Sequence, residues 1–219
     1  MDLAGLASLN LGQLHLRRGQ LATAGECYDD ALERFSESSN ESDRLATLFN
    51  MAHLAREAED WGMASTLYEQ VMAVASRIGR PDVELGARAG QALAALAVGA
   101  RSVAEDAMRW IRANVETRPE WWFLGRDLVD AVRIRLAAER GDEAYAMRLL
   151  NDAVVLANRY DVYLGAFLVA ECAPALRRAG EPLIALIDRL IPEVEAFGFN
   201  GILQRLTNVR MSLLASAAA

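Results

Sequence analysis

The sequence predicts an all-α fold made of about five stacked helical hairpins and a C-terminal capping helix. The first observation is a repeat of about forty residues, marked by one small residue in the second helix of each hairpin. These residues lie 40, 40, 42 and 39 positions apart, at Ala24, Ala64, Ala104, Ala146 and Ala185. The second observation is a turn residue five positions before each of them, at Gly19, Glu59, Gly99, Gly141 and Gly180. The third is that helix-forming residues dominate and no segment alternates as a strand would.

Elementary packing explains this pattern. A glycine ends the first helix because it enters the left-handed conformation easily. A small residue lets two helices approach closely, and a large one a turn later, such as Tyr28 or Tyr68, fills the groove beside the neighbouring hairpin. Since one hairpin cannot bury its apolar stripe alone, the hairpins are expected to stack. We predict a single solenoid over residues 1–219, with hairpins at 1–38, 43–79, 82–116, 119–160 and 161–198 and a capping helix at 201–216.

The first hairpin is predicted from helices at residues 1–18 and 20–35. Six leucines between Leu3 and Leu16 give the first of these helices a broad apolar face. Residues 36–43 (Ser-Glu-Ser-Ser-Asn-Glu-Ser-Asp) are polar throughout and predict the clearest loop in the chain.

The second and third hairpins follow from helices predicted at 44–58, 62–78, 83–98 and 103–115. Between them, Gly79-Arg80-Pro81-Asp82 combines a stop signal with a start signal, and Asp82 is the expected cap. The third hairpin is the richest in alanine, so its helices are expected to lie very close to their neighbours.

The remaining helices are predicted at 120–140, 142–160, 161–179, 181–197 and 202–215. Pro174 and Pro192 lie inside two of these helices, so a kink or break is expected at each. The last helix is expected to cap the stack, and residues 212–219 are expected to fray.

Composition excludes several classes of function. The net charge is -7, and no Lys/Arg-rich cluster interrupts the chain, so direct nucleic-acid binding is not expected. All 23 basic residues are arginines, which we attribute to a GC-rich, bacterial genome. Cys27 and Cys172 lie on predicted apolar faces in distant hairpins, so we expect two unpaired core thiols and a reducing cytoplasm. No signal peptide and no membrane span are predicted.

No motif points to catalysis. The chain lacks a phosphate-binding glycine loop, a zinc-type Cys/His spacing and a nucleophile with its base in context. We therefore expect no enzyme activity, no metal site and no cofactor.

The hairpin pattern resembles the tetratricopeptide repeat. The residues that carry the resemblance are Leu11, Gly12, Gly19, Ala24, Tyr28 and Ala31 in the first unit, and Ala52, Ala64 and Tyr68 in the second. The spacing is similar to that of a subgroup with forty-residue repeats. That subgroup includes partner-binding scaffolds and the sensor regions of large ATP-dependent transcriptional activators of bacteria.

The resemblance implies a right-handed α-α superhelix whose first helices line a concave groove. We expect a non-catalytic scaffold that binds a protein or peptide segment there. The alternative is a ligand-sensing or regulatory segment of a larger bacterial signalling protein. Self-association into a homo-oligomer is a further expectation.

The resemblance also implies that an Asn just before the Leu-Gly pair binds the ligand backbone. Asn10 and Asn50 match this position, whereas Gly90 replaces it in the third unit. Helical spacing adds further groove residues, whose amides would bind backbone and whose arginines would pair with carboxylates. The complete set is Asn10, Gln13, Arg17, Asn50, His53, Glu57, Arg88, Arg133 and Arg135. The alternative for all of them is an ordinary solvated helix face.

Trp121-Trp122-Phe123 places three aromatic residues in a row. Trp121 and Trp122 are candidates for an exposed anchor, because aromatic side chains dominate interface energetics. The alternative is that they pack between the third and fourth hairpins. His15 occupies the position of a packed tyrosine in the family pattern, so a core role is expected for it.

Overall fold

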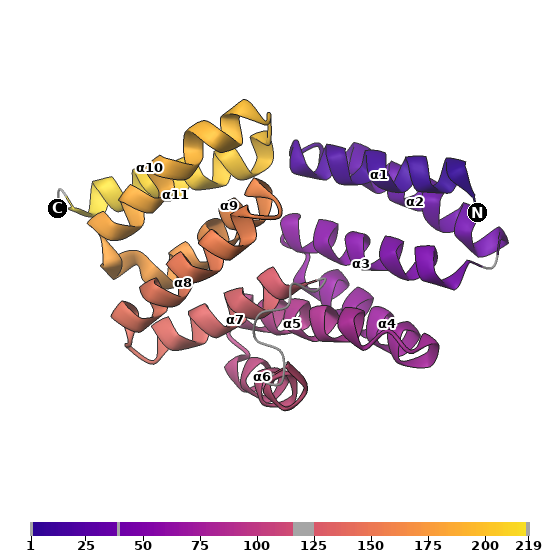
Figure 1. Ribbon diagram of the computed structural model, residues 1–219, viewed down its shortest axis with the longest axis horizontal. Coiled ribbons are helices and arrows are strands. Elements are labelled where there is room, and N and C mark those ends of the chain that lie inside the picture. Colours follow the sequence, from indigo (N-terminus) through magenta and orange to yellow (C-terminus); the bar gives the residue numbers. More distant parts are fainter. Residues whose placement is uncertain (1, 39, 116–124, 218–219) are drawn as a thin grey trace. The chain divides into compact units, whose positions relative to one another are not determined.

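The computed structural model describes residues 2–38, 40–115 and 125–217 (Figure 1). All regular structure in these residues is helical, with eleven α-helices and one 3-10 helix. The predicted all-α fold is therefore confirmed. None of the described helices combines the length and the hydropathy that crossing a membrane would require.

The chain divides into two compact units, described separately below. The first unit contains residues 1–16 and 20–129, and the second contains residues 17–19 and 130–219. In the first unit, consecutive helices pack against one another from α2 through α6 (Figure 1). Apart from Arg17, which falls in the second unit, the helices of this part of the chain are α1 (Leu3–Arg17), α2 (Leu21–Glu37), α3 (Glu41–Glu57), α4 (Trp61–Ile78), α5 (Pro81–Ala97) and α6 (Arg101–Val115).

The second unit is built from the later helices. Within it, α9 packs against α8, α10 and α11, and α10 also packs against α11. Cys172 at the end of α9 is buried, which raises the pKa of its thiol well above the usual value. The elements are α7 (Arg126–Glu139), which belongs to this unit from residue 130 onward, α8 (Glu143–Asn158), α9 (Val162–Cys172), the 3-10 helix η1 (Ala173–Ala179), α10 (Glu181–Ala196) and α11 (Asn200–Ala217).

The core of each hairpin repeats one spacing along its second helix. In α2 the fully buried residues are Ala24, Tyr28, Ala31 and Phe35. The same spacing is buried in α4, at Ala64, Tyr68, Val71 and Ala75, and in α8, at Ala146, Leu150, Ala153 and Ala157. Ala104 in α6 is also fully buried. The small residues predicted to mark the first four hairpins are thus core residues.

The marker predicted for the fifth hairpin is wrong, because Ala185 is exposed. In α10 the buried spacing begins two residues earlier and runs through Leu183, Ile187, Leu190 and Val194. The reason lies in the turn. Gly180 has φ 55 and ψ -122, and α10 starts at the very next residue. This turn therefore differs from the earlier ones, and the register shifts with it.

The first four turns share a left-handed residue. Gly19, Gly99 and Gly141 have φ values of 75, 78 and 84. Glu59, which replaces glycine in the second turn, also has a positive φ, of 59. The turn conformation is therefore kept even where its usual residue is absent, at the expense of backbone strain at Glu59.

The starts of α3 and α5 differ from the prediction. The loop expected at 36–43 is shorter, because α3 begins at Glu41 behind Asn40, whose side chain accepts a hydrogen bond from the backbone N–H of Asp43 at 3.3 Å. Asp82 does not cap α5. The cap position is held by Arg80, and Pro81 occupies the first helical turn. The Asp82 carboxylate instead accepts hydrogen bonds from the Arg80 guanidinium, which lower the pKa of that carboxyl.

The two internal prolines have different effects. At Pro174 the α-helix has ended at Cys172 and the chain continues as η1, so the expected break is present. Pro192 lies within α10, which continues to Ala196, so no break occurs there. The fraying expected from Ser212 is also wrong as far as residue 217, because α11 remains helical to that point.

Candidate partner-binding site

Asn10 and Asn50 occupy equivalent positions on α1 and α3 of the first unit. Asn10 is exposed and Asn50 is half-buried. In the part of the chain that the structure describes, neither side-chain amide is hydrogen-bonded to another residue. Each amide offers both a donor group and an acceptor, the combination that a peptide backbone can satisfy.

The third position of this series is closed by packing. An ideal Cβ atom built on Gly90 of α5 would lie 2.2 Å from Cζ of Tyr68. An asparagine at position 90 would therefore overlap the tyrosine ring. The loss of the asparagine in the third unit has a steric cause, and the series has two members.

Two further candidates lie on the same helices. Gln13 is half-buried on α1, close to Asn10 in sequence. Glu57, on α3, accepts a hydrogen bond from Nη2 of Arg56 at 3.1 Å, and the Arg56 side chain is only 4% exposed. The Glu57 carboxylate is thus already paired with an almost completely buried cation.

His53 packs among aromatic rings. Its ring centroid lies 4.6 Å from that of Phe49 and 6.2 Å from that of Tyr68. The residue keeps some exposed area, but its Nε2 atom is buried and has no hydrogen-bond partner among the described residues. Burial, together with the nearby charge of Arg56, lowers the pKa of His53 to about 3. The ring is therefore neutral at pH 7.

Arg17 and Arg88 are both paired within the chain. Arg17, the last residue of α1, belongs with the second unit, where its guanidinium forms an ion pair with Asp161 at 2.6 Å. Arg88 of α5 pairs with Glu84 at 2.8 Å, and its Cζ lies 4.0 Å from the ring centroid of Trp110. This cation–π contact fixes Arg88 against α6.

The two candidates on α7 lie in the second unit and have different surroundings. Arg133 is exposed, and its Nη2 donates to the hydroxyl of Tyr145 at 3.2 Å. Arg135 donates from Nη1 to Oε1 of Glu171 at 2.9 Å, and Arg205 donates from Nη2 to Oε2 at 3.4 Å. Glu171 is only 8% exposed, so a buried carboxylate joins the two arginines, of which Arg205 is 34% exposed at its side chain. We interpret this triad as a structural network.

The sequence reasoning missed this network, although a signal was present. Glu171 is the one carboxylate in the apolar run from Val162 to Cys172, and an isolated charge in such a run indicates a buried ion pair. Its partners lie 36 and 34 positions away, at Arg135 and Arg205, and only the packing of α7 and α11 against it identifies them.

The remaining two predictions concern the tryptophan pair Trp121 and Trp122, and His15. Trp121 and Trp122, the candidate aromatic anchor, lie outside the described residues. His15 is half-buried rather than in the core, with Nδ1 2.6 Å from Oε1 of Gln20.

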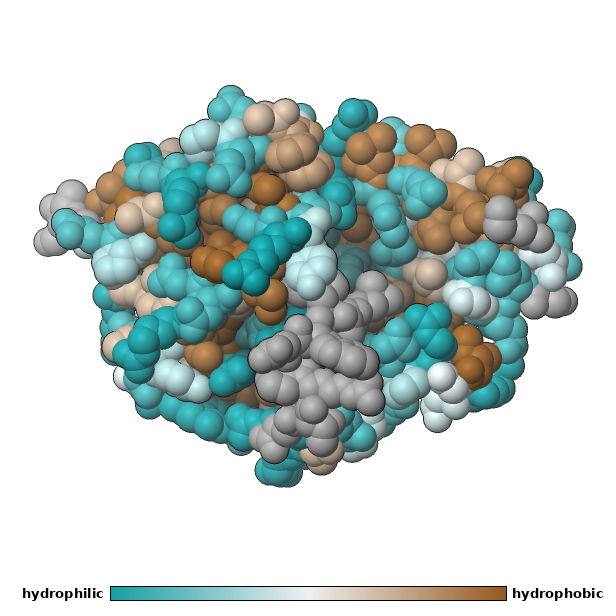
Figure 2. Space-filling model, viewed as in Figure 1, coloured by the Kyte–Doolittle hydropathy of each residue, from teal (hydrophilic) through white to brown (hydrophobic). Residues whose placement is uncertain are grey.

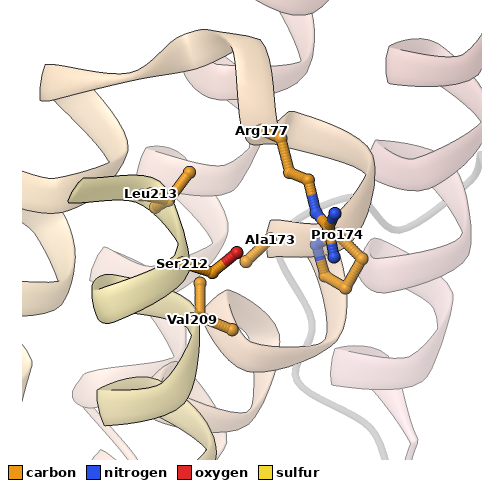
Figure 3. A pocket seen from close by; sticks show the side chains of 6 residues that line it. All are labelled: Ala173, Pro174, Arg177, Val209, Ser212 and Leu213. Carbon is orange, nitrogen blue, oxygen red and sulfur yellow. The ribbon is translucent and has the colours of Figure 1, made fainter. Parts of the chain in front are cut away.

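The second unit contains a small cavity between η1 and α11 (Figure 3). Its volume is about 30 Å³, which leaves room for about two water molecules rather than an organic substrate. The lining residues are Ala173, Pro174, Arg177, Val209, Ser212 and Leu213. Within the described ranges, His, Cys, Asp and Glu side chains nowhere gather in a group of three or more that could hold a metal ion.

Comparison with known proteins agrees with this geometry. The tetratricopeptide repeat family model matches residues 3–77, which span the first two hairpins. No curated protein sequence is significantly similar to the chain.

Solved structures extend the likeness in fold. A crystal structure of TPR-like repeats, described as coming from a kinesin light chain of Podosopora anserina, has a TM-score of 0.53 at 18% identity. The alignment covers 97% of this chain and 98% of that one. A variant of the same protein has a TM-score of 0.54 at 20% identity, over 94% of this chain and 99% of that one. Residues 3–77 therefore match the tetratricopeptide repeat, and the resemblance of this chain to the tetratricopeptide-repeat family is confirmed.

Proposed function

We propose that this chain is a non-catalytic scaffold that binds an extended or helical protein segment along the first helices of its hairpins. Proteins with this repeat are generally interaction scaffolds, and the observation that carries the proposal here is the pair formed by Asn10 and Asn50. Two amides that bond to none of the described residues recur forty positions apart on the first helices of successive hairpins. Water can satisfy both amides in the free protein, and a bound peptide backbone would offer each of them a donor and an acceptor.

The other candidates contribute unequally to this site. Gln13 can add a third amide on α1, and Arg133 of the second unit keeps an exposed guanidinium that can pair with a carboxylate. Arg88 and Arg135 hold internal ion pairs, so we assign them to structure. We also assign His53 and Glu57 to structure, because the His53 ring packs against Phe49 and the Glu57 carboxylate is paired with Arg56.

The test is selection of peptide ligands from a random library displayed on phage, with the intact chain immobilised. Binding of each selected peptide is then measured by fluorescence anisotropy. We expect Asn10→Ala and Asn50→Ala to weaken binding about tenfold each, the effect of about one good hydrogen bond. Neither variant should change the melting temperature, because neither amide is bonded to any residue in ranges 2–38, 40–115 and 125–217.

A matched control is Asn151→Ala on α8. Asn151 is also an exposed helical asparagine, but its Nδ2 donates to the carbonyl of Met147 at 3.0 Å. This substitution should leave peptide affinity unchanged. Selected peptides that bind the Asn10→Ala, Asn50→Ala double variant as tightly as the unchanged chain would contradict the proposed site.

Four finer expectations accompany the proposal. The net charge of -7 favours a protein partner over nucleic acid, and a gel-shift titration at low salt tests this. The two free cysteines fit a cytoplasmic protein. The regulatory alternative, a sensor segment of a bacterial signalling protein, rests on the resemblance to forty-residue repeats alone. Self-association is tested by light scattering at two concentrations.

A further inference from the structure

The N-terminal helix carries an apolar stripe that the first hairpin does not bury. Leu3, Leu11 and Leu14 are 69%, 49% and 38% exposed, and Ala7 is exposed between them. These four residues lie within one side of the helix at 100° per residue. We call them the outer face of α1. In Figure 2, brown apolar residues gather where α1 lies in Figure 1.

The forty-residue repeat identifies the equivalent face on α3, the first helix of the next hairpin. Forty positions after three of its residues stand Thr47, Met51 and Leu54 of α3. Thr47 is fully buried, and Met51 and Leu54 pack against the core of the first hairpin. An ideal Cβ on Gly25 of α2 would lie 3.5 Å from Cδ2 of Leu54. On α3, therefore, this face packs against α2, the second helix of the preceding hairpin.

The third hairpin repeats the arrangement. Ala87 and Ala94 of α5 occupy the equivalent positions and are 0% and 2% exposed. Between them, Gln91 donates from Nε2 to Oε1 of Glu69 on α4, at 2.9 Å. The α4–α5 packing is thus the same interface as the α2–α3 packing. The first helices of the three hairpins in this unit are α1, α3 and α5. In α3 and α5 this face packs against the preceding helix, whereas in α1 its leucines are exposed.

We propose that the outer face of α1 binds one amphipathic helix of a partner, aligned antiparallel to α1 as α2 is to α3. Continuity with the internal interfaces defines the chemistry of that helix. The partner helix has glycine or alanine at the positions that contact Leu11 and Leu14, with larger apolar residues on either side. In α2, Gly25 is the small residue, and Ala24 and Tyr28 are its apolar neighbours. Asn10 borders this surface, because it stands next to Leu11 and four residues before Leu14 on α1, and its equivalent on α5, Gly90, packs against Tyr68 of α4. Asn50 lies on α3 and is not part of the surface, so this proposal goes beyond the peptide site and does not depend on it.

The probe is a fluorescein-labelled peptide with the sequence of residues 20–38, which contains α2. Its binding to the intact chain is measured by fluorescence anisotropy. We expect saturable binding that falls at least tenfold in Leu11→Glu and in Leu14→Glu. Both side chains are partly exposed, and circular dichroism checks that each variant keeps its helix content. A peptide carrying Gly25→Leu should bind at least tenfold more weakly, because the added side chain occupies the space that Leu11 or Leu14 needs.

The matched control is Val155→Glu, which places the same charge on an apolar residue of α8 that is 52% exposed. It should leave binding unchanged. Binding that Leu11→Glu does not alter would mean that the peptide enters elsewhere, for example by displacing α2 from α3, and would overturn the proposal. Sedimentation that shows a dimer abolished by Leu11→Glu would identify the occupant as a second copy, which also overturns it.

A tethered measurement keeps the test decisive if the free peptide is poorly helical. In a fusion protein, a copy of residues 1–40 is joined before Met1 of the intact chain. A second α2 then precedes the original α1 and is connected to it by the same loop that connects α2 to α3. We expect amide exchange in the original α1 to slow at least tenfold, and Leu11→Glu in that helix to abolish the protection. Unchanged exchange would overturn the proposal.

Discussion

Gly12 of α1 lies directly against the ring of Tyr28 in α2, so closely that an ideal Cβ at position 12 would be 2.4 Å from Cε1 of the tyrosine. Tyr28 is fully buried, and Gly12 is buried with it. The large residue of the second helix is thus accommodated by the absence of a side chain on the first. This complementarity of size determines how closely the two helices of the hairpin approach.

Gly12→Ala should therefore destabilise the protein. Overpacking by one methyl group costs about 1–3 kcal/mol, and the gain in helix propensity offsets about 1 kcal/mol of that. We expect the free energy of unfolding to fall by up to about 2 kcal/mol in urea denaturation. In a Tyr28→Ala background, where the ring is gone, the same substitution should no longer destabilise.

Gly62→Ala is the control for that experiment. The nearest atom to a Cβ at position 62 of α4 is Oδ1 of Asp60, at 3.8 Å. This substitution should leave stability unchanged or raise it by about 0.5 kcal/mol. A Gly12→Ala variant as stable as Gly62→Ala would mean that α1 and α2 are not held this closely.

Tyr68→Ala should be among the most destabilising single changes in the first unit. Its ring is fully buried, contacts Phe49 at 6.1 Å between centroids, and fills the space above Gly90. Truncation leaves a cavity between α4 and α5, so we expect a loss of about 3–5 kcal/mol in chemical denaturation. A loss below about 1 kcal/mol would place Tyr68 outside the core.

Glu59→Gly should stabilise the protein. Glu59 has a φ of 59, a left-handed conformation that costs a residue with a side chain roughly 1–2 kcal/mol. Glycine relieves this strain but loses more entropy on folding, so we expect a gain of about 1 kcal/mol by thermal or chemical unfolding. Glu59→Ala keeps the strain and should give no gain. Equal gains in both variants would assign the effect to the lost charge.

The protein should lose stability as the pH falls from about 6.5, because of His53. Burial holds the pKa of His53 in the folded state at about 3, below its ordinary value of 6.5. The stabilising contribution of the neutral ring is complete above pH 6.5. As the pH falls toward 3, the unfolded chain binds a proton that the folded chain does not, and stability falls by up to about 1.4 kcal/mol per pH unit.

Urea denaturation at pH 7, 6 and 5 measures this slope above the range in which ordinary carboxylates titrate. His53→Gln removes the titrating group and should flatten the dependence, although it also lowers stability at pH 7 by disturbing the contacts with Phe49 and Tyr68. A slope that is the same in the variant would show that another group is responsible.

The candidate site was predictable in part. A forty-residue spacing suffices to place Asn10 and Asn50 at equivalent positions, because helical periodicity is local. It does not reveal whether an arginine on the same helix is already paired. Arg88 meets Trp110 of the next helix, and Arg135 meets Glu171 across 36 positions of sequence. These contacts depend on how helices pack, which spacing alone does not specify.

The sequence by itself determined the helical hairpins of this protein, the residues that mark the first four, and the absence of strands in the described chain. These features follow from local preferences: small and large apolar residues at helical spacing, and glycine at left-handed turns. Tertiary structure decided the rest. It moved the fifth register to Leu183, because Gly180 forms a different turn, and it excluded a side chain at position 90, because Tyr68 fills that space. Both outcomes depend on steric contact between segments distant in sequence or on one backbone angle, which residue identities alone do not fix.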